Sequence, residues 1–326
     1  FMFDRFHRRI NYVRISVTDR CNLRCRYCMP EGGISWKAHE EILSYEEILR
    51  IVRVLASLGI TKVRLTGGEP LIRKDLASFI EELKKVPGIK RTAVTTNGLL
   101  LKKELPALEA AGLDGINLSI DSLDSRIFQK IARSPKALDV RESLVALLES
   151  RIRYKKINVV PIQGVNEGEL VQLAQLAKDH LVDVRFIELM PMGFARASGL
   201  VGIPLEQVQT KVRIAFGEPK PVKRREDDGP VTLCTYPGFI GRLGFIDAVE
   251  NKFCHACNRV RLTADGFLKP CLASGECIDL RTRMRDGATE KELKEVIVSQ
   301  IYTKPREHDF IECGVDETRS MAQIGG

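Results

Sequence analysis

Between residue 12 and about residue 210, short apolar runs rich in β-branched residues alternate with longer segments of helical periodicity. Each apolar run predicts a strand, and each periodic segment predicts a helix with one apolar face. Such alternation is typical of successive β-α units around parallel strands, and we count six units. The predicted strands span residues 12–17, 61–66, 91–95, 115–120, 156–160 and 183–188.

Two of the predicted helices have clear boundaries. In the first, Ser44 and Glu47 form a capping box and Gly59 ends the helix. Its apolar face consists of Ile48, Ile51, Val52 and Leu55. In the second, Asp75 is the predicted N-cap. Its apolar face consists of Leu76, Phe79, Ile80 and Leu83.

Six parallel units can form an open doubly wound sheet or an incomplete barrel, and periodicity does not distinguish the two. Polar segments follow several of the strands, at the carboxyl ends where α/β folds bind their ligands. Near Gly217 the helical repetition gives way to short segments punctuated by Gly and Pro. We therefore expect a first domain over residues 1–217 and a second region over residues 218–326.

The composition is that of a globular protein, with 44% hydrophobic and 29% charged residues among 326. The chain has no run of about 18 apolar residues, and its Arg-rich start lacks the apolar core of a signal peptide. We therefore expect no membrane association and a cytoplasmic location.

The net charge of +8 favours a polyanionic partner, either a nucleic acid, an anionic membrane or a nucleotide phosphate. Charge alone does not choose among them. The basic run at residues 223–225 is followed at once by the acidic residues 226–228, which is typical of a solvated loop rather than a nucleic-acid-binding surface.

Six of the nine cysteines form two tight groups, which indicates metal ligation rather than disulfides. Cys21, Cys25 and Cys28 have C-x3-C-x2-C spacing. Three thiolates leave one iron of a four-iron cluster open to an outside ligand. The alternative is a zinc knuckle, but zinc requires about four ligands, and His39, the nearest candidate, lies beyond a Gly-Gly turn.

Cys254, Cys257 and Cys271 form the second group. Spacing alone slightly favours a zinc ribbon, completed by Cys277 or His255. However, Arg259 and Arg261 follow at alternate positions of an extended segment and share one face. Two guanidinium groups there fit phosphate binding, which a structural ribbon does not need, although a solvated pair remains the alternative. Cys234, Cys277 and Cys313 are expected to have no ligand role.

Short polar motifs follow three of the predicted strands. The turn Gly67-Gly68-Glu69 allows a ligand to approach the backbone closely. The later strands end in small polar residues, among them Thr95, Ser119 and Asp121, which suit ribose hydroxyls. Ordinary turn formation explains each motif in isolation.

Taken together, these motifs resemble the GTP 3′,8-cyclase family within the radical S-adenosylmethionine (SAM) superfamily. The resemblance rests on Arg14, the run TDRCNLRCRYCMP, the GGEP turn, the run CNRVRLTADG from Cys257 and the terminal Gly325-Gly326. It covers essentially the full length. It implies an α/β fold, an incomplete (β/α)6 TIM-like barrel whose C-terminal extension carries a second cluster.

The resemblance also implies roles for individual residues. Two 4Fe-4S clusters would be held by Cys21, Cys25, Cys28, Cys254, Cys257 and Cys271. SAM would contact Tyr27, Gly67, Gly68, Glu69, Thr95, Ser119 and Met190. GTP would contact Arg14, Lys62, Arg64, Lys156, Arg185, Arg259 and Arg261. The catalytic residues would be Arg14, Arg259, Arg261, Gly325 and Gly326.

The implied reaction cleaves SAM, uses the resulting radical to abstract hydrogen from ribose C3′ of GTP, and joins C3′ to guanine C8. The implied partners are an electron donor such as a flavodoxin or ferredoxin and a downstream cyclic pyranopterin monophosphate synthase. We also expect a homodimer. Two alternatives are weaker. A radical SAM peptide-modifying enzyme would need more cysteines, and a zinc-stabilised nucleic-acid-binding protein would show salt-sensitive RNA binding.

Overall fold

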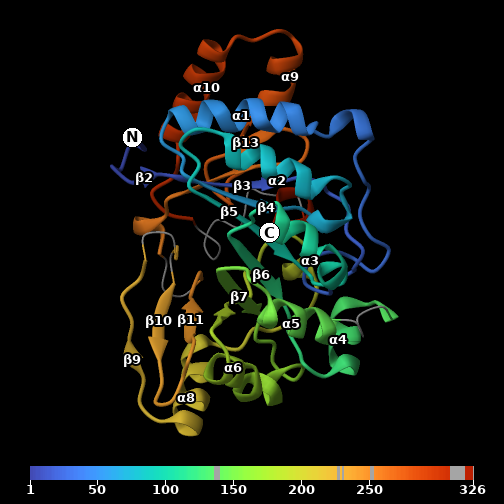
Figure 1. The fold of residues 1–326 in the computed structure, drawn as a ribbon, viewed down its shortest axis with the longest axis vertical. Coiled ribbons are helices and arrows are strands. Elements are labelled where there is room, and N and C mark those ends of the chain that lie inside the picture. The colour runs from blue at the N-terminus through green and yellow to red at the C-terminus, as the bar shows by residue number, and fades with distance from the viewer. Residues whose placement is uncertain (136–139, 226–227, 230, 250–252, 309–319, 326) are drawn as a thin grey trace.

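The structure is a computed structural model that describes residues 1–135, 140–225, 228–229, 231–249, 253–308 and 320–325 (Figure 1). A twelve-stranded sheet forms its centre, and eight consecutive strands of that sheet are parallel. In spatial order they are β12 (Arg259–Leu262), β3 (Tyr12–Ser16), β4 (Lys62–Thr66), β5 (Arg91–Thr96), β6 (Gly115–Ser119), β7 (Tyr154–Val159), β8 (Asp183–Ile187) and β11 (Arg242–Ile246).

Antiparallel strands extend both ends of this parallel array. They are β13 (Phe267–Lys269) and β14 (Ile278–Asp279) beyond β12, and β10 (Thr232–Thr235) and β9 (Lys220–Pro221) beyond β11. Within the described part of the chain, no pairing joins the outermost strands β14 and β9, so the sheet stays open. A separate hairpin joins β1 (Met2–Phe3) to β2 (Arg9–Ile10).

All six predicted strands are present within one or two residues of their expected bounds. The incomplete barrel is confirmed as well. The pattern did not indicate that the C-terminal region adds β11 beside β8 and β12 beside β3. The region after residue 217 thus extends both edges of the same sheet, while the boundary itself stays a prediction.

Helices cover the outside of the sheet. The longer ones are α1 (Tyr45–Ser57), α2 (Leu76–Lys85), α3 (Leu101–Ala110), α4 (Ser125–Ala132), α5 (Val140–Glu149), α6 (Leu170–Asp179), α8 (Leu205–Phe216) and α10 (Glu290–Tyr302). The shorter ones are α7 (Phe194–Ala197), α9 (Leu280–Arg285) and α11 (Met321–Ile324). The C-terminal helix α10 packs on α1, as Figure 1 shows. Among the described residues, no helix is both long and apolar enough to cross a bilayer.

The two helices with predicted boundaries form as expected, with one correction. Ser44 and Glu47 exchange both capping-box hydrogen bonds at the start of α1. Asp75 does occupy the N-cap position of α2, but its backbone is left-handed, with φ of 60°, and its side chain makes no capping bond. The prediction of a capping side chain was therefore wrong. The expected apolar faces of both helices are buried.

The parallel strands carry two different faces. On β3 and β4 the residues Val13, Ile15, Val63 and Leu65 are fully buried in the apolar core. The intervening positions are polar or charged, because successive side chains of a strand point to opposite sides. The interior of a (β/α) barrel is usually filled by branched apolar side chains. Here it is basic instead, which adapts the interior to an anionic ligand.

Candidate active site

A cavity of about 340 Å³ lies at the carboxyl ends of the parallel strands. Both predicted cysteine groups line it: Cys21, Cys25, Cys28, Cys254, Cys257 and Cys271. The first group lies in the loop after β3, and the second flanks β12 and β13. Because β12 pairs directly with β3, groups more than 200 residues apart in the sequence face one space.

Most other predicted site residues line the same cavity. They are Arg14, Tyr27, Gly67, Gly68, Glu69, Thr95, Ser119, Met190, Arg259 and Arg261. Four basic residues predicted to bind GTP do not line it, namely Lys62, Arg64, Lys156 and Arg185. Gly325 does not line it either, and Gly326 and Cys313 lie outside the described residues.

The three thiols of the first group are half-buried, and they interact electrostatically with one another. Burial, then the charges of Cys28 and Cys21, raises the pKa of Cys25 well above its usual value. Burial likewise raises the pKa of Cys21 to about 11 and that of Cys28 to about 12. Thiols in such a setting stay protonated unless a cationic metal takes them as thiolates.

The donor sets fit iron-sulfur clusters better than zinc. Each group offers three free thiols to the cavity. Among the described residues, no three His, Cys, Asp or Glu side chains converge on a single ion, as a closed zinc site requires. A cubane distributes its thiolates over separate irons and needs no such convergence. His255 and Cys277, the alternative zinc ligands, do not line the cavity.

The second group lies in a more cationic setting. Burial alone would raise the pKa of Cys257, but Lys304 and Arg259 outweigh it and lower that pKa to about 6. Burial raises the pKa of Cys254. Lys304 lines the cavity and was not predicted from the sequence, because no motif surrounds it.

The Gly-Gly-Glu turn after β4 packs directly on the first cysteine loop. The amide of Gly68 donates to the Thr18 carbonyl at 2.8 Å, and the amide of Glu69 donates to the Arg20 carbonyl at 2.8 Å. A Cβ atom at residue 68 would lie only 2.2 Å from the Arg20 carbonyl oxygen. Glycine is therefore required for the turn and the loop to meet.

Glu69 presents a buried carboxylate beside the first cysteine loop. It accepts hydrogen bonds from Thr96 Oγ1 at 2.7 Å and from the backbone amides of Asn97 and Leu71. Burial nevertheless raises its pKa to about 7. Such a carboxylate gains from a cationic partner, and the amino group of an amino-acid ligand would supply one.

Tyr27 connects the cysteine loop to the end of β6. Its hydroxyl donates to Asp121 Oδ2 at 2.6 Å, and Asp121 Oδ1 accepts from the Val160 amide at 2.8 Å. Asp121 lines the cavity, and burial raises its pKa to about 6. The pair fixes the loop that carries the first thiol group.

Three arginines lie on two adjacent strands inside the cavity. Arg14 on β3 is in register with Arg261 on β12, and Arg259 lies two residues earlier on the same face. The alternative of a solvated outer pair is therefore wrong. Burial, followed by the charge of Arg261, lowers the pKa of Arg14. Such crowding of positive charge favours an anion between the strands.

The C-terminal tail also reaches these strand ends. Arg261 Nη1 donates to the Gly325 carbonyl. Gly325 has a φ of 86°, and a Cβ there would lie 2.5 Å from Thr66 Oγ1. Met321 and Ala322 of α11 line the cavity. The tail is therefore in contact with Arg261 and borders the cavity.

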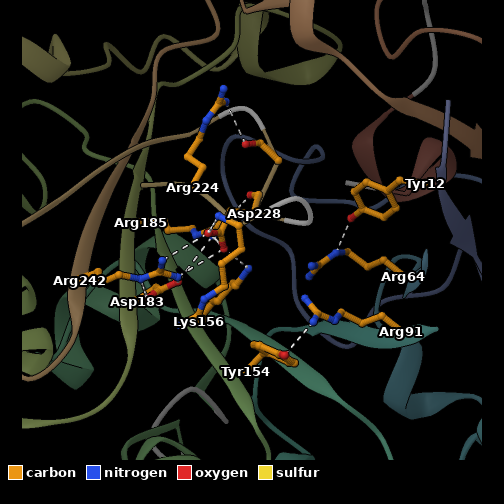
Figure 2. Close-up of polar contacts among 12 residues, drawn as sticks. Tyr12, Arg64, Arg91, Tyr154, Lys156, Asp183, Arg185, Arg224, Asp228 and Arg242 are labelled. Atoms are coloured by element: carbon orange, nitrogen blue, oxygen red, sulfur yellow. Dashed lines mark hydrogen bonds and ion pairs between the residues drawn. The ribbon is translucent and has the colours of Figure 1, made fainter. Parts of the chain in front are cut away.

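The four basic residues outside the cavity lining interact electrostatically with one another, and we call them the basic wall: Lys62, Arg64, Lys156 and Arg185. Figure 2 shows Arg64, Lys156 and Arg185. Arg64 Nε donates to the Tyr12 hydroxyl at 2.5 Å. Burial alone would raise the pKa of Tyr12, but Arg64 and Arg14 outweigh it and lower it to about 7.

Asp228 faces two members of the basic wall. Its carboxylate lies 3.5 Å from Lys156 Nζ and 3.3 Å from Arg185 Nη2, and Arg242 lies beside it at 3.3 Å (Figure 2). Asp228 is buried, so the prediction of a solvated acidic run was wrong for this residue. Lys223, Arg224 and Arg225 are exposed, as expected.

Comparison with known proteins places the chain among radical SAM proteins. Residues 15–177 match the family model of the radical SAM superfamily, and residues 182–310 match that of Molybdenum Cofactor Synthesis C. The GTP 3′,8-cyclase of Moorella thermoacetica is 43% identical over 326 residues, and that of Heliobacterium modesticaldum is 42% identical over 331 residues. Both alignments span all of each protein.

The fold also has relatives among solved structures. The crystal structure of Streptococcus suis SuiB bound to S-adenosylmethionine matches with a TM-score of 0.59 at 18% identity. The match covers 91% of this chain and 66% of that chain. At this identity the likeness concerns the fold alone.

Proposed function

Because this chain belongs to the GTP 3′,8-cyclase family of radical SAM enzymes, we propose that it converts GTP to 3′,8-cyclo-7,8-dihydro-GTP, the first step of molybdenum cofactor biosynthesis. One observation carries this proposal. Two groups of three free cysteines face one cavity, and the buried Arg261 and the half-buried Arg259 lie beside the second group.

The first thiol group holds the 4Fe-4S cluster that binds SAM. When bound, this cluster and SAM supply the carbon radical that starts the reaction. Glu69 and the backbone of Gly67 and Gly68 hold the amino-acid part of SAM, because the buried carboxylate accepts from an ammonium group. Thr95, Ser119 and Met190 border the rest of the cofactor, and Tyr27 with Asp121 keeps the loop in place.

Cys254, Cys257 and Cys271 would hold the second 4Fe-4S cluster, which would supply an open coordination site for the guanine of GTP. Arg14, Arg259 and Arg261 orient the nucleotide between the two clusters through bidentate hydrogen bonds. Gly325 keeps Arg261 aimed into the cavity through its carbonyl.

The basic wall receives the triphosphate. The wall has four cationic side chains, which suits an elongated anion. Lys62 and Arg64 lie on β4, whereas Lys156 and Arg185 lie on the adjacent strands β7 and β8. Burial lowers the pKa of Lys62 to about 7 and that of Lys156 to about 6, with neighbouring cations adding to the effect. A polyphosphate would relieve this repulsion and restore both charges.

The family of this chain also points to partner proteins. A low-potential electron donor such as a flavodoxin or ferredoxin would reduce the cluster held by Cys21, Cys25 and Cys28, and a cyclic pyranopterin monophosphate synthase would take the product. A homodimer and a cytoplasmic location complete the proposal, since a reducing compartment keeps the thiols available as ligands.

The direct test is anaerobic reconstitution followed by product analysis with GTP and SAM. We expect about eight irons per chain for two cubanes, formation of 5′-deoxyadenosine and a cyclised nucleotide. Normal 5′-deoxyadenosine formation without any cyclised nucleotide would reject GTP as the substrate.

A further inference from the structure

Lys304 is a buried lysine at the edge of the second thiol group. Its side chain is 2% exposed, and it lines the same cavity as Cys254, Cys257 and Cys271. Its Nζ donates to the Arg259 carbonyl at 2.9 Å and to the Pro270 carbonyl at 2.5 Å. One ammonium group is thus held at a fixed point beside three thiols.

The two carbonyls belong to the two segments that carry these thiols. Arg259 begins β12 two residues after Cys257, and Pro270 immediately precedes Cys271. These segments come from opposite ends of the β12–β13 hairpin. The side chain of Lys304 therefore connects them across the open end of the hairpin and fixes the spacing of their cysteines.

The charge of Lys304 has no acidic partner in the described part of the chain, where no ion pair joins it to a carboxylate. A buried charge without compensation is strongly destabilising. Cys254 and Cys257 are among the groups that interact with it electrostatically. An anionic cluster held by these thiolates would place further negative charge next to Lys304.

The residues that follow Lys304 are held in place by hydrogen bonds from Arg8. Arg8 donates to the carbonyls of Cys254 at 2.7 Å, Pro305 at 2.6 Å and Arg306 at 2.9 Å. Asp4 Oδ2 lies 2.6 Å from Arg8 Nε, and this ion pair balances the charge of Arg8. These hydrogen bonds fix the segment next to Lys304, and the ion pair between Arg8 and Asp4 carries no net charge.

We propose that Lys304 is a positioning residue of the second cluster, which holds the two ligand segments together and, as a fixed cation, favours the more negative, reduced state of the cluster. Groups around a cluster tune its potential through charge and hydrogen bonding. This proposal rests on the second cluster of the proposed function but not on the identity of the substrate.

The test compares Lys304→Gln, Lys304→Met and Lys304→Arg in the full chain. Cys21, Cys25 and Cys28 are replaced by Ala in every sample, so that only the second group binds a cluster. After anaerobic reconstitution, redox titration followed by electron paramagnetic resonance gives the midpoint potential. For both neutral variants we expect a tenfold lower ratio of reduced to oxidised cluster at fixed potential, which corresponds to about 59 mV for one electron.

The other variants separate charge from structure. Lys304→Arg should keep the wild-type potential, because it keeps the cation and its donors. Arg8→Lys should also keep it while lowering thermal stability, because the ion pair with Asp4 survives but the fork to three carbonyls is lost. Equal potentials in wild type and both neutral variants would overturn the proposal, as would a shift of the same size in Arg8→Lys.

The cluster-free protein gives a second measurement. Lys304→Met loses both hydrogen bonds that join the two ligand segments, so its cluster-free form should unfold at a lower temperature than wild type, whereas Lys304→Arg should not. A cluster-free Lys304→Met protein that unfolds at the wild-type temperature would show that Lys304 does not hold the two segments together and would overturn the proposal. Neither measurement uses GTP or SAM, so rejection of GTP as substrate leaves both interpretable.

Discussion

The two thiol groups are built in opposite ways although they face one cavity. The first comes from eight consecutive residues, and the carboxylates Glu69 and Asp121 lie near it. The second is assembled from both ends of a β-hairpin, and the cations Lys304 and Arg259 lie near it. A cluster beside carboxylates is harder to reduce, and one beside cations attracts anions. The cavity thus has a cofactor end that favours an ammonium group and a substrate end that favours an anionic ligand.

Replacement of a single cysteine ligand should abolish cluster binding at that end of the cavity. Cys25→Ala should lose the first cluster and Cys257→Ala the second, so that each retains about four of eight irons. Both variants should form no cyclised nucleotide, because each end is required. Iron content and product analysis after reconstitution check this.

Cys234→Ala is the matched control, because Cys234 is buried but does not line the cavity. It should keep all irons and full activity. A Cys257→Ala protein that still carries two clusters would contradict the assignment of the second group.

Arg261→Ala should lower turnover of GTP without affecting either cluster. It removes a cation in contact with both the cavity and Gly325, and we expect turnover to fall about 100-fold, as for the loss of one preorganised charge. Iron content should not change. Steady-state kinetics with GTP measure the loss, and Arg283→Ala, on the exposed side of α9, serves as the control. Equal turnover in both variants would refute the role of Arg261.

Gly68→Ala should weaken SAM binding without affecting the residues around the second thiol group. The new Cβ would meet the Arg20 carbonyl at 2.2 Å and push the turn away from the cysteine loop. We expect SAM affinity to fall by about tenfold, in line with the loss of a supporting contact around a metal site. Calorimetric titration with SAM measures it. Gly168→Ala, where no atom lies within 4 Å of the new Cβ, should bind SAM normally.

Asp228→Asn should strengthen phosphate binding at the basic wall. The carboxylate occupies Lys156 and Arg185 and competes with any phosphate for them. We expect GTP to bind about tenfold more tightly, which corresponds to about 1.4 kcal/mol. Asp183→Asn, which loses a carboxylate held mainly by Arg242, should have a smaller effect. Weaker GTP binding in Asp228→Asn would mean that Asp228 orients the wall instead of competing for it.

The same carboxylate predicts a small dependence of stability on acid. Burial alone would raise the pKa of Asp228, but the Arg225 amide and Lys156, Arg242 and Arg185 lower it from 3.8 to about 2. A lowered pKa adds stability above the unfolded value that is lost as pH falls towards 2. Cluster-free wild type should therefore lose more stability between pH 4 and pH 2 than Asp228→Asn. Parallel thermal melts that show the same loss would contradict this.

Sequence patterns predicted the first end of the cavity better than the second. The ligands and the GGEP turn lie in short motifs at strand ends, and alternating periodicity places those ends together. The pairing of β12 with β3 depends on contacts between distant segments and leaves no periodic signal. Lys304 stands outside any motif, and Asp228 ends a charged run whose other described members are exposed. Burial of single charges depends on tertiary packing, which local patterns do not encode.

The most direct test of the shared cavity is pulsed electron paramagnetic resonance on reduced, reconstituted protein with labelled ligands. SAM carrying ¹⁵N in its amino group should couple to one cluster, and GTP carrying ¹⁵N in its guanine should couple to the other. Loss of the SAM coupling in Cys25→Ala and of the GTP coupling in Cys257→Ala would assign each end. A single cluster in wild type, or a guanine nitrogen that couples to neither, would contradict the account.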